Sequence, residues 1–133
     1  MKVLIVDGYN AIHKIPELDD LLESSLEEAR RAVTGMAKEY QRRTGGVSEV
    51  FVVFDGRDEY SGQSFGRPGQ VFSKTGEGDR KIIRLAQDKS TRFHVIVASD
   101  DNYVGNSSRA AGATVITISE FYSVASGRRR AKK

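Results

Sequence analysis

Three aspartates stand at the ends of apolar runs in this sequence. Asp7 closes the run KVLIVD, Asp55 closes EVFVVFD and Asp100 closes HVIVASD. The runs are nearly continuous in Val, Ile and Phe, which is typical of parallel strands buried on both faces. Because the carboxyl ends of parallel strands share one edge of a sheet, we expect the three carboxylates to meet where open α/β folds bind ligands.

A fourth acid, Asp79, stands at the start of a predicted helix and can face the same edge. Carboxylates packed within a few ångströms repel one another unless a cation lies among them. With no cysteine and no clustered histidine, oxygen ligands favour Mg²⁺ or Mn²⁺ over Zn²⁺. Such an ion can activate water and stabilise the charge of a phosphoryl transition state.

Each of these acids also has a purely structural explanation, because Asp is favoured at turns and helix N-caps. Asp55, which precedes a glycine, is typical of a turn, and Asp101 is typical of an N-cap. The combination of three strand-end acids with one helix-start acid is what favours a site. Of the two histidines, His94 opens a predicted strand and is interpreted as structural, whereas His13 stays a minor candidate for a phosphate contact.

Composition excludes several other classes of protein. The absence of cysteine rules out disulfides, thiolate zinc sites, iron–sulfur ligation and thiol catalysis. Nucleotide-binding glycine loops are also missing. No apolar run approaches the ~20 residues of a membrane span, and the run after Lys2 is too short for a signal peptide. A cytoplasmic protein with no membrane partner is expected.

Alternating strands and helices must position these acids. A capping box begins at Ser25, and the apolar residues that follow recur at helical spacing. The alternation implies right-handed βαβ crossovers and a three-layer α/β/α domain with a mainly parallel central sheet. The predicted strands are Lys2–Asp7, Glu49–Asp55, His94–Asp100 and Ala113–Ser119, and the later predicted helices are Asp79–Lys89, Asp101–Ala111 and Glu120–Ala125.

The basic charge of the chain is concentrated at its C-terminus. The net charge is +3, but five of the 21 Lys and Arg residues lie in the last six positions. We therefore expect one domain over residues 1–126 and a basic tail over 127–133. The tail could bind phosphates by releasing counterions, or it could be a frayed, solvated end.

Four motifs together resemble a known family. They are VDGYNAIH at Val6–His13, VVFDG at Val52–Gly56, FSKTGEGDRKI at Phe72–Ile82 and ASDD at Ala98–Asp101. They resemble the NYN domains of the PIN-like nuclease superfamily, in particular the YacP-like branch. The resemblance runs from residue 1 to about residue 122.

The resemblance implies a metal-dependent ribonuclease with a parallel-sheet core. Asp7, Asp79 and Asp100 match the acidic positions that bind Mg²⁺ or Mn²⁺, and Asn10 matches the polar residue that supports the first acid. Asp55 matches the acid of the second strand motif, and Asp55 and Asp101 are further candidate ligands. Relatives are associated with RNA and sometimes with the translating ribosome, so both are expected partners.

The chain departs from the family pattern just before the helix acid. YacP-like members usually place Thr and a small residue there, whereas this chain has Glu77 and Gly78. The departure concerns the local helix cap and the fit of the substrate, and Glu77 adds another candidate acid.

The favoured hypothesis is an endoribonuclease that cleaves single-stranded RNA, including mRNA at the ribosome, with a metal-activated water. Basic residues near the proposed cleft and in the tail would hold phosphates, and aromatic residues would stack on unpaired bases. The segment Gly56–Gly78, which contains six of the 13 glycines, is expected to be mobile and to close over RNA, unless it is a hairpin with no role. The candidate RNA contacts are Tyr9, Arg57, Tyr60, Phe65, Arg67, Lys74, Arg80, Lys81, Arg128, Arg129 and Arg130.

Two alternatives belong to other classes. One is an RNA- or ribosome-binding module of the same fold with weak or no catalysis. The other is a receiver-like phosphoacceptor domain with Asp55 as the acceptor. The receiver-like fold needs an acidic pair after the first strand, whereas Asp7 is followed by Gly8.

Overall fold

The protein is described by a computed structural model that covers residues 1–56 and 68–128. Five strands form one sheet in the order β3-β2-β1-β4-β5, and every neighbouring pair is parallel. This confirms the predicted α/β class and its parallel sheet. The strands are β1 (Lys2–Asp7), β2 (Val47–Phe54), β3 (Gln70–Phe72), β4 (His94–Ala98) and β5 (Thr114–Ile116).

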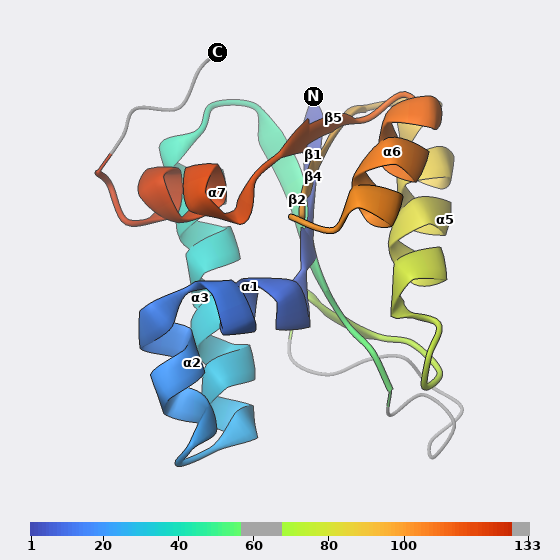
Figure 1. The fold of residues 1–133 in the computed structure, drawn as a ribbon. Coiled ribbons are helices and arrows are strands. Elements are labelled where there is room, and N and C mark those ends of the chain that lie inside the picture. The colour runs from blue at the N-terminus through green and yellow to red at the C-terminus, as the bar shows by residue number, and fades with distance from the viewer. Residues whose placement is uncertain (57–67, 129–133) are drawn as a thin grey trace.

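Helices cover both faces of the sheet, which gives the three layers that the sequence predicts. In Figure 1, α1, α2, α3 and α7 lie on one side of the sheet, and α5 and α6 lie on the other. The helices are α1 (Gly8–Lys14), α2 (Pro16–Leu22), α3 (Leu26–Arg43), α5 (Gly78–Ser90), α6 (Asn102–Ala110) and α7 (Ile118–Ala125). No described helix is both long enough and apolar enough to cross a membrane.

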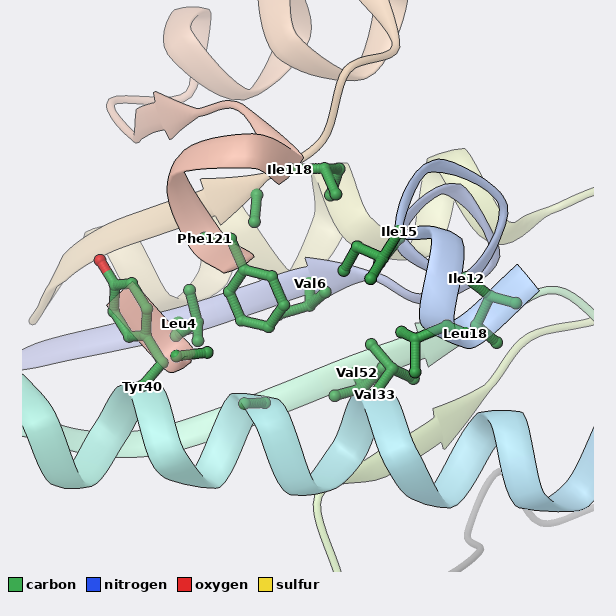
Figure 2. Close-up of a cluster of buried hydrophobic side chains, with 14 of the residues drawn as sticks. Leu4, Val6, Ile12, Ile15, Leu18, Val33, Tyr40, Val52, Ile118 and Phe121 are labelled. Atoms are coloured by element: carbon green, nitrogen blue, oxygen red, sulfur yellow. The ribbon is translucent and has the colours of Figure 1, made fainter. Parts of the chain in front are cut away.

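The central strand β1 divides the core into two clusters. Leu4 and Val6 face the cluster under α3 and α7, and Val3 and Ile5 face the cluster under α5 and α6. Figure 2 shows the first cluster, in which Phe121 of α7 packs beside the β1 side chains. All four of these β1 residues are fully buried, as expected for a strand covered on both faces.

Local capping explains where several elements begin and end. The Ser25 hydroxyl accepts a hydrogen bond from the Glu28 N–H at 3.1 Å, which confirms the predicted start of α3. Thr117 likewise accepts from the Glu120 N–H at 3.0 Å. Because this cap begins α7 at Ile118, the last strand is shorter than the predicted Ala113–Ser119.

Two short helices between β1 and α3 were not predicted. Pro16 occupies the first turn of α2, where its missing N–H costs no hydrogen bond. The short strand β3 pairs in parallel with β2 and so does not form a hairpin with it. Residues 57–67 of the predicted mobile segment lie outside the described part of the chain.

The strand order excludes the receiver-like alternative. Receiver domains use the order 2-1-3-4-5, in which the first strand lies between the second and the third. Here β1 lies between β2 and β4, and β3 is an edge strand. The phosphoacceptor hypothesis for Asp55 is therefore wrong on topology.

Candidate active site

The acids lie at the point where the sheet topology reverses. The helix that follows β1 covers one face of the sheet, and the helix that follows the adjacent β4 covers the other. A crevice opens between two such connections at the carboxyl ends of the strands. Asp7 is the last residue of β1, and Ser99, Asp100 and Asp101 follow β4, so these residues meet at this crevice.

Ser99 joins the first acid to the end of β4. Its hydroxyl donates to Asp7 Oδ2 at 2.8 Å and accepts from the Asp101 N–H at 3.1 Å. Ser99 is buried, so water competes little for these bonds. One serine therefore sets the position of the Asp7 carboxylate relative to the start of α6.

Asp7 occupies an environment that disfavours its charge. Burial, opposed by the Ser99 hydrogen bond, raises the pKa of Asp7 from 3.8 to about 6. The negative charges of Asp79 and Asp101 contribute to this raised pKa, and the backbone of Asn10 opposes it. Without a cation, the carboxyl group is thus poised to hold a proton close to neutral pH.

Asp79 belongs to the same electrostatic cluster. Burial is the largest cause that raises the pKa of Asp79, followed by the charges of Asp101 and Asp55. Asp79 lies in the first turn of α5. Four acids from four separate segments of the chain, Asp7, Asp55, Asp79 and Asp101, therefore act on one another at this edge of the sheet.

Asp55 is held by the turn that leads into α5. Its Oδ1 accepts from the Gly76 N–H at 2.7 Å. A Cβ atom on Gly78 would lie only 3.1 Å from the Asp55 Cβ, so glycine lets α5 begin close to the end of β2. Glu77, the other departure from the family pattern, lies 3.8 Å from the Arg80 guanidinium.

The two neighbouring acids after β4 have different environments. Asp100 Oδ1 accepts from the Ile118 N–H at 2.9 Å, and the Asp100 N–H donates to Asn10 Oδ1 at 2.8 Å. Asp101 Oδ1 accepts from the Val104 N–H at 2.9 Å, which confirms Asp101 as the N-cap of α6. Of the two, Asp101 is the acid whose charge raises the pKa of both Asp7 and Asp79.

The carboxylate oxygens of these aspartates are chemically suited to bind a hard divalent cation. Carboxylate oxygens are the ligands that Mg²⁺ and Mn²⁺ prefer, and acids that raise one another's pKa gain when a cation neutralises them. In the described part of the chain, no three His, Asp or Glu side chains are grouped closely enough to hold an ion as they stand. The structure thus brings the predicted acids to one edge without arranging them as a finished ligand set.

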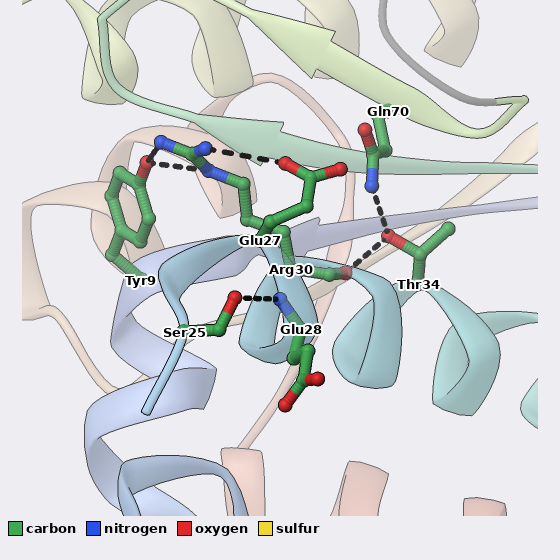
Figure 3. Close-up of polar contacts among 7 residues, drawn as sticks. All are labelled: Tyr9, Ser25, Glu27, Glu28, Arg30, Thr34 and Gln70. Carbon is green, nitrogen blue, oxygen red and sulfur yellow. Dashed lines mark hydrogen bonds and ion pairs between the residues drawn. The ribbon is translucent and has the colours of Figure 1, made fainter. Parts of the chain in front are cut away.

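The turn after β1 is fixed by aromatic packing. A Cβ atom on Gly8 would come within 2.5 Å of the Phe54 ring, so this position requires glycine. The Tyr9 hydroxyl accepts from Arg30 Nε at 3.1 Å and Nη2 at 2.7 Å, as Figure 3 shows. The Tyr9 ring lies 5.2 Å from the Phe54 ring.

Arg30 is a site-supporting residue that the sequence analysis missed. Its side chain is only 13% exposed, and its guanidinium lies within 6.0 Å of the ring centres of Tyr9, Phe54 and Phe72. Tyr9, which is expected to stack on RNA, is thus half-buried and held in place by Arg30. No sequence signal separates Arg30 from the other charged residues of α3.

A basic hollow lies beside the acids, between the end of β3 and α5. It has a volume of about 280 Å³ and includes three predicted RNA contacts, together with Arg84, which was not predicted. The i, i+4 spacing of Arg80 and Arg84 on a predicted helix is the signal that could have found it. The lining residues, hereafter the basic hollow, are Ser73, Lys74, Glu77, Arg80, Lys81 and Arg84.

Arg128 lies apart from the other described RNA candidates. Its guanidinium stacks 5.1 Å from the Tyr122 ring, and the preceding Gly127 lies against the Arg43 side chain at the end of α3. That end leads into the start of β2, on the edge of the sheet opposite the acids. The other candidates fall outside the described residues: Arg57, Tyr60, Phe65, Arg67, Arg129 and Arg130.

Tyr103 is a further residue that the sequence analysis missed. It is 58% exposed, and it is the only aromatic side chain in the described part of the chain that counts as exposed. It lies in the first turn of α6, two positions after Asp101. Its place directly after the ASDD motif is the signal that could have found it.

The family is established by comparison with known proteins. A model of the YacP-like NYN domain matches residues 4–133. The chain belongs to the YacP-like NYN domain family. This NYN domain is 39% identical over 102 residues to the uncharacterized protein YacP of Bacillus subtilis (strain 168). The match covers 71% of this chain and 59% of YacP, so the chain spans about three-fifths of that relative.

Solved structures support the same assignment. The crystal structure of Rae1 (YacP) from Bacillus subtilis is 32% identical with a TM-score of 0.74, covering 96% of this NYN domain and 75% of that chain. A substituted form of Rae1 gives 31% identity and a TM-score of 0.76, with 94% and 74% covered. NYN domains belong to the PIN-like nuclease superfamily, so a nuclease is the kind of activity that the fold supports.

Proposed function

We propose that this NYN domain is a metal-dependent endoribonuclease that acts on single-stranded RNA. The observation that carries the proposal is the buried Asp7, whose pKa is raised by burial and by the charges of Asp79 and Asp101 at the topological switch point. Grouped carboxylates can promote the cleavage of a phosphodiester bond only when they bind a cation, because bare carboxylates repel the phosphate. The basic hollow beside them supplies phosphate contacts.

Mg²⁺ or Mn²⁺ is the proposed cofactor, with Asp7, Asp79 and Asp100 as ligands and Asp55 and Asp101 as further candidates. The ion would supply charge for the phosphate and acidify a water molecule. The chain's own contribution is orientation. Ser99 holds the Asp7 carboxylate, and the Asn10 side chain holds the backbone at Asp100.

The basic hollow is proposed to hold phosphates other than the one that is cleaved. Arg80, Lys81 and Arg84 follow Asp79 by one, two and five residues, so they lie about 100–200° around the helix axis from it. Phosphates bound there would position the RNA without conveying its sequence. Arg128 would add a weaker contact at the opposite edge. Arg129 and Arg130, which lie outside the described residues, are proposed as further phosphate contacts.

Unpaired bases are proposed to stack on exposed aromatic rings near the acids. Tyr103 offers such a ring, whereas the Tyr9 ring is half-buried and held by Arg30 and Phe54. Stacking needs a base that is not paired, which favours single-stranded RNA over a duplex. The ribosome is a proposed partner and the cytoplasm the proposed location, because mRNA would be a substrate of this kind.

A second candidate function is an RNA- or ribosome-binding module with weak catalysis. The observation that favours it is that no three acidic side chains of the described residues stand in ligand positions. Calorimetric titration with Mn²⁺ separates the two functions. A nuclease binds the ion through Asp7, whereas a binding module shows the same heat with and without Asp7→Asn.

Cleavage of a labelled, unstructured RNA in Mn²⁺ or Mg²⁺ tests the first proposal. Asp7→Asn should fold normally and reduce cleavage by on the order of 10³-fold, because it removes a charge that the transition state needs. Asp20→Asn is a matched control, since Asp20 is an exposed acid of α2. Equal cleavage by the wild type and Asp7→Asn in excess Mn²⁺ would refute the assignment of Asp7.

A further inference from the structure

A second hollow flanks the acids on the side opposite the basic hollow. It lies between α6 and β5 and has a volume of about 290 Å³. We infer that it holds one unpaired nucleoside of the RNA, next to the cleaved bond, and reads its base and sugar rather than its phosphate. This inference rests on the proposed function. The residues that carry it, hereafter the α6–β5 hollow, are Asp100, Asp101, Asn102, Gly105, Arg109 and Val115.

The α6–β5 hollow is continuous with the acid cluster. Ser99, whose hydroxyl donates to Asp7, also lines the hollow, and Asp101 belongs to both. An RNA strand that places a phosphate at Asp7 therefore has its neighbouring nucleoside at the mouth of this hollow. The basic hollow begins at Ser73, directly after the other edge strand, so the two hollows lie on either side of the acids.

Glycine and apolar side chains give the hollow its space. A Cβ atom on Gly105 would lie 3.6 Å from both Arg109 Nη1 and Val115 Cγ1, which is ordinary contact. Any longer side chain at this position would occupy the hollow itself. Val115 is half-buried, its side chain lies on the face covered by α5 and α6, and it provides an apolar wall for a ring. The volume is close to the lower end of ligand pockets, ~300 Å³, which suits a single nucleoside.

The charges of this hollow argue against a phosphate. Arg109 is its one cation, and the Asp100 and Asp101 carboxylates face the same space. Even with an ion on Asp100, this hollow has one cationic side chain against four in the basic hollow, so it attracts a further phosphate less. Carboxylate oxygens that the ion does not use can accept from the hydroxyl and amino donors of a nucleoside. Arginine in turn donates to acceptors on base edges.

Two polar side chains of the hollow are available for a ligand. Within the described part of the chain, Arg109 has no ion pair, and its Nη1 makes one long hydrogen bond of 3.4 Å to Asn106. Asn102 has no hydrogen-bond partner among the described residues, and its amide can both donate and accept. These groups could recognise a base edge and a 2′-hydroxyl together.

The test measures cleavage rates for RNAs that differ only in the nucleotides flanking one cut site. For the wild type we expect a preference for one base at a single flanking position, and a loss of rate when that nucleotide is 2′-deoxy. Arg109→Gln should reduce the base preference by roughly tenfold, which is the discrimination of one good base contact. Arg92→Gln, at the opposite edge of the sheet, should leave the preference unchanged.

A second variant keeps the charge of the α6–β5 hollow and reduces only its volume. Gly105→Ala adds a methyl group at ordinary contact distance and should fold, yet it should reduce the rate on the preferred RNA more than on the others. Identical base profiles for wild type, Arg109→Gln and Gly105→Ala would overturn the inference. A uniform loss with Arg109→Gln on every RNA would also overturn it, because that result indicates a phosphate contact.

Binding experiments separate failure of the inference from failure of the proposed function. Fluorescence anisotropy in EDTA, with the same RNAs, measures base preference without cleavage. If the wild type binds with an Arg109-dependent preference but does not cut, the nuclease proposal fails and the nucleoside site stands. If it cuts with a preference that Arg109→Gln and Gly105→Ala do not alter, the nucleoside site fails and the nuclease stands.

Discussion

Two hollows of nearly equal size flank the acids, and they differ in charge. The basic hollow, about 280 Å³, has four cations and one acid, whereas the α6–β5 hollow, about 290 Å³, has one cation and two acids. Volume alone would assign them the same ligand. Their charges instead assign phosphates to the first and a nucleoside to the second, which separates the positioning of RNA from the recognition of its sequence.

The largest expected effect concerns the acid that lies between the two hollows. The pKa of Asp7 is 3.8 in the reference state and about 6 in the fold. Between these values the folded state keeps a proton that the unfolded chain has lost, so the free energy of unfolding falls as pH rises through this window. Asp7→Asn has no carboxyl group to titrate, so its free energy of unfolding does not fall in this window. It should therefore be about 2–3 kcal/mol more stable than wild type at pH 7 without divalent ions.

Urea unfolding in EDTA at pH 4 and pH 7 measures this difference. The advantage of Asp7→Asn over the wild type should be small at pH 4 and large at pH 7. Asp20→Asn should show no such change, because Asp20 is exposed on α2. If the difference in free energy of unfolding between Asp7→Asn and the wild type is the same at pH 4 and pH 7, the surroundings do not raise the pKa of Asp7.

A double substitution tests whether the basic hollow acts on phosphates alone. Lys74→Gln with Arg84→Gln removes two cations for which the described residues provide no ion pair. RNA affinity should fall by on the order of tenfold for every sequence, and the slope of log affinity against log salt should shrink by about 1.5. Anisotropy titrations at several salt concentrations measure both quantities. A change in base preference would break the contrast between the two hollows.

Tyr103→Ala tests the exposed ring at the start of α6. Affinity for single-stranded RNA should fall by about fivefold, since one stacked base contributes about 1 kcal/mol or more. Affinity for a duplex of the same length should not change. Tyr103→Phe, which keeps the ring, is the matched control and should bind as the wild type does.

The smallest effect is expected from the basic tail. Deleting residues 128–133 should weaken RNA binding by about twofold at low salt and leave cleavage at saturating RNA unchanged, because Arg128 lies at the edge opposite the acids. Cleavage rates at saturating and limiting RNA distinguish the two effects. A slower rate at saturation would place the tail at the site itself.

The sequence predicted the sheet well because its strands are buried on both faces. Continuous runs of Val, Ile and Phe leave little choice but a parallel strand, and three of these runs end beside the acids. The helices α1 and α2 were missed because each is only seven residues long and carries too few apolar repeats for a helical period.

The site was predicted in outline but not in its connections. Aspartate positions could be placed from strand ends, yet the hydrogen bonds from Ser99 to Asp7 and from Arg30 to Tyr9 join residues far apart in the chain. Local patterns contain no information on such pairs. The different environments of Asp100 and Asp101 likewise depend on α7, whose Ile118 N–H binds Asp100.

The central position of β1 has a consequence for when the acids come together. Lys2 pairs with Val47 on one side and with His94 on the other, so the first strand of the chain stays incomplete until segments about 45 and 92 residues later arrive. Contacts of such long sequence separation form slowly. During synthesis, Asp7 would therefore lack its acidic neighbours until the chain has grown past Asp101, so the acid cluster assembles late.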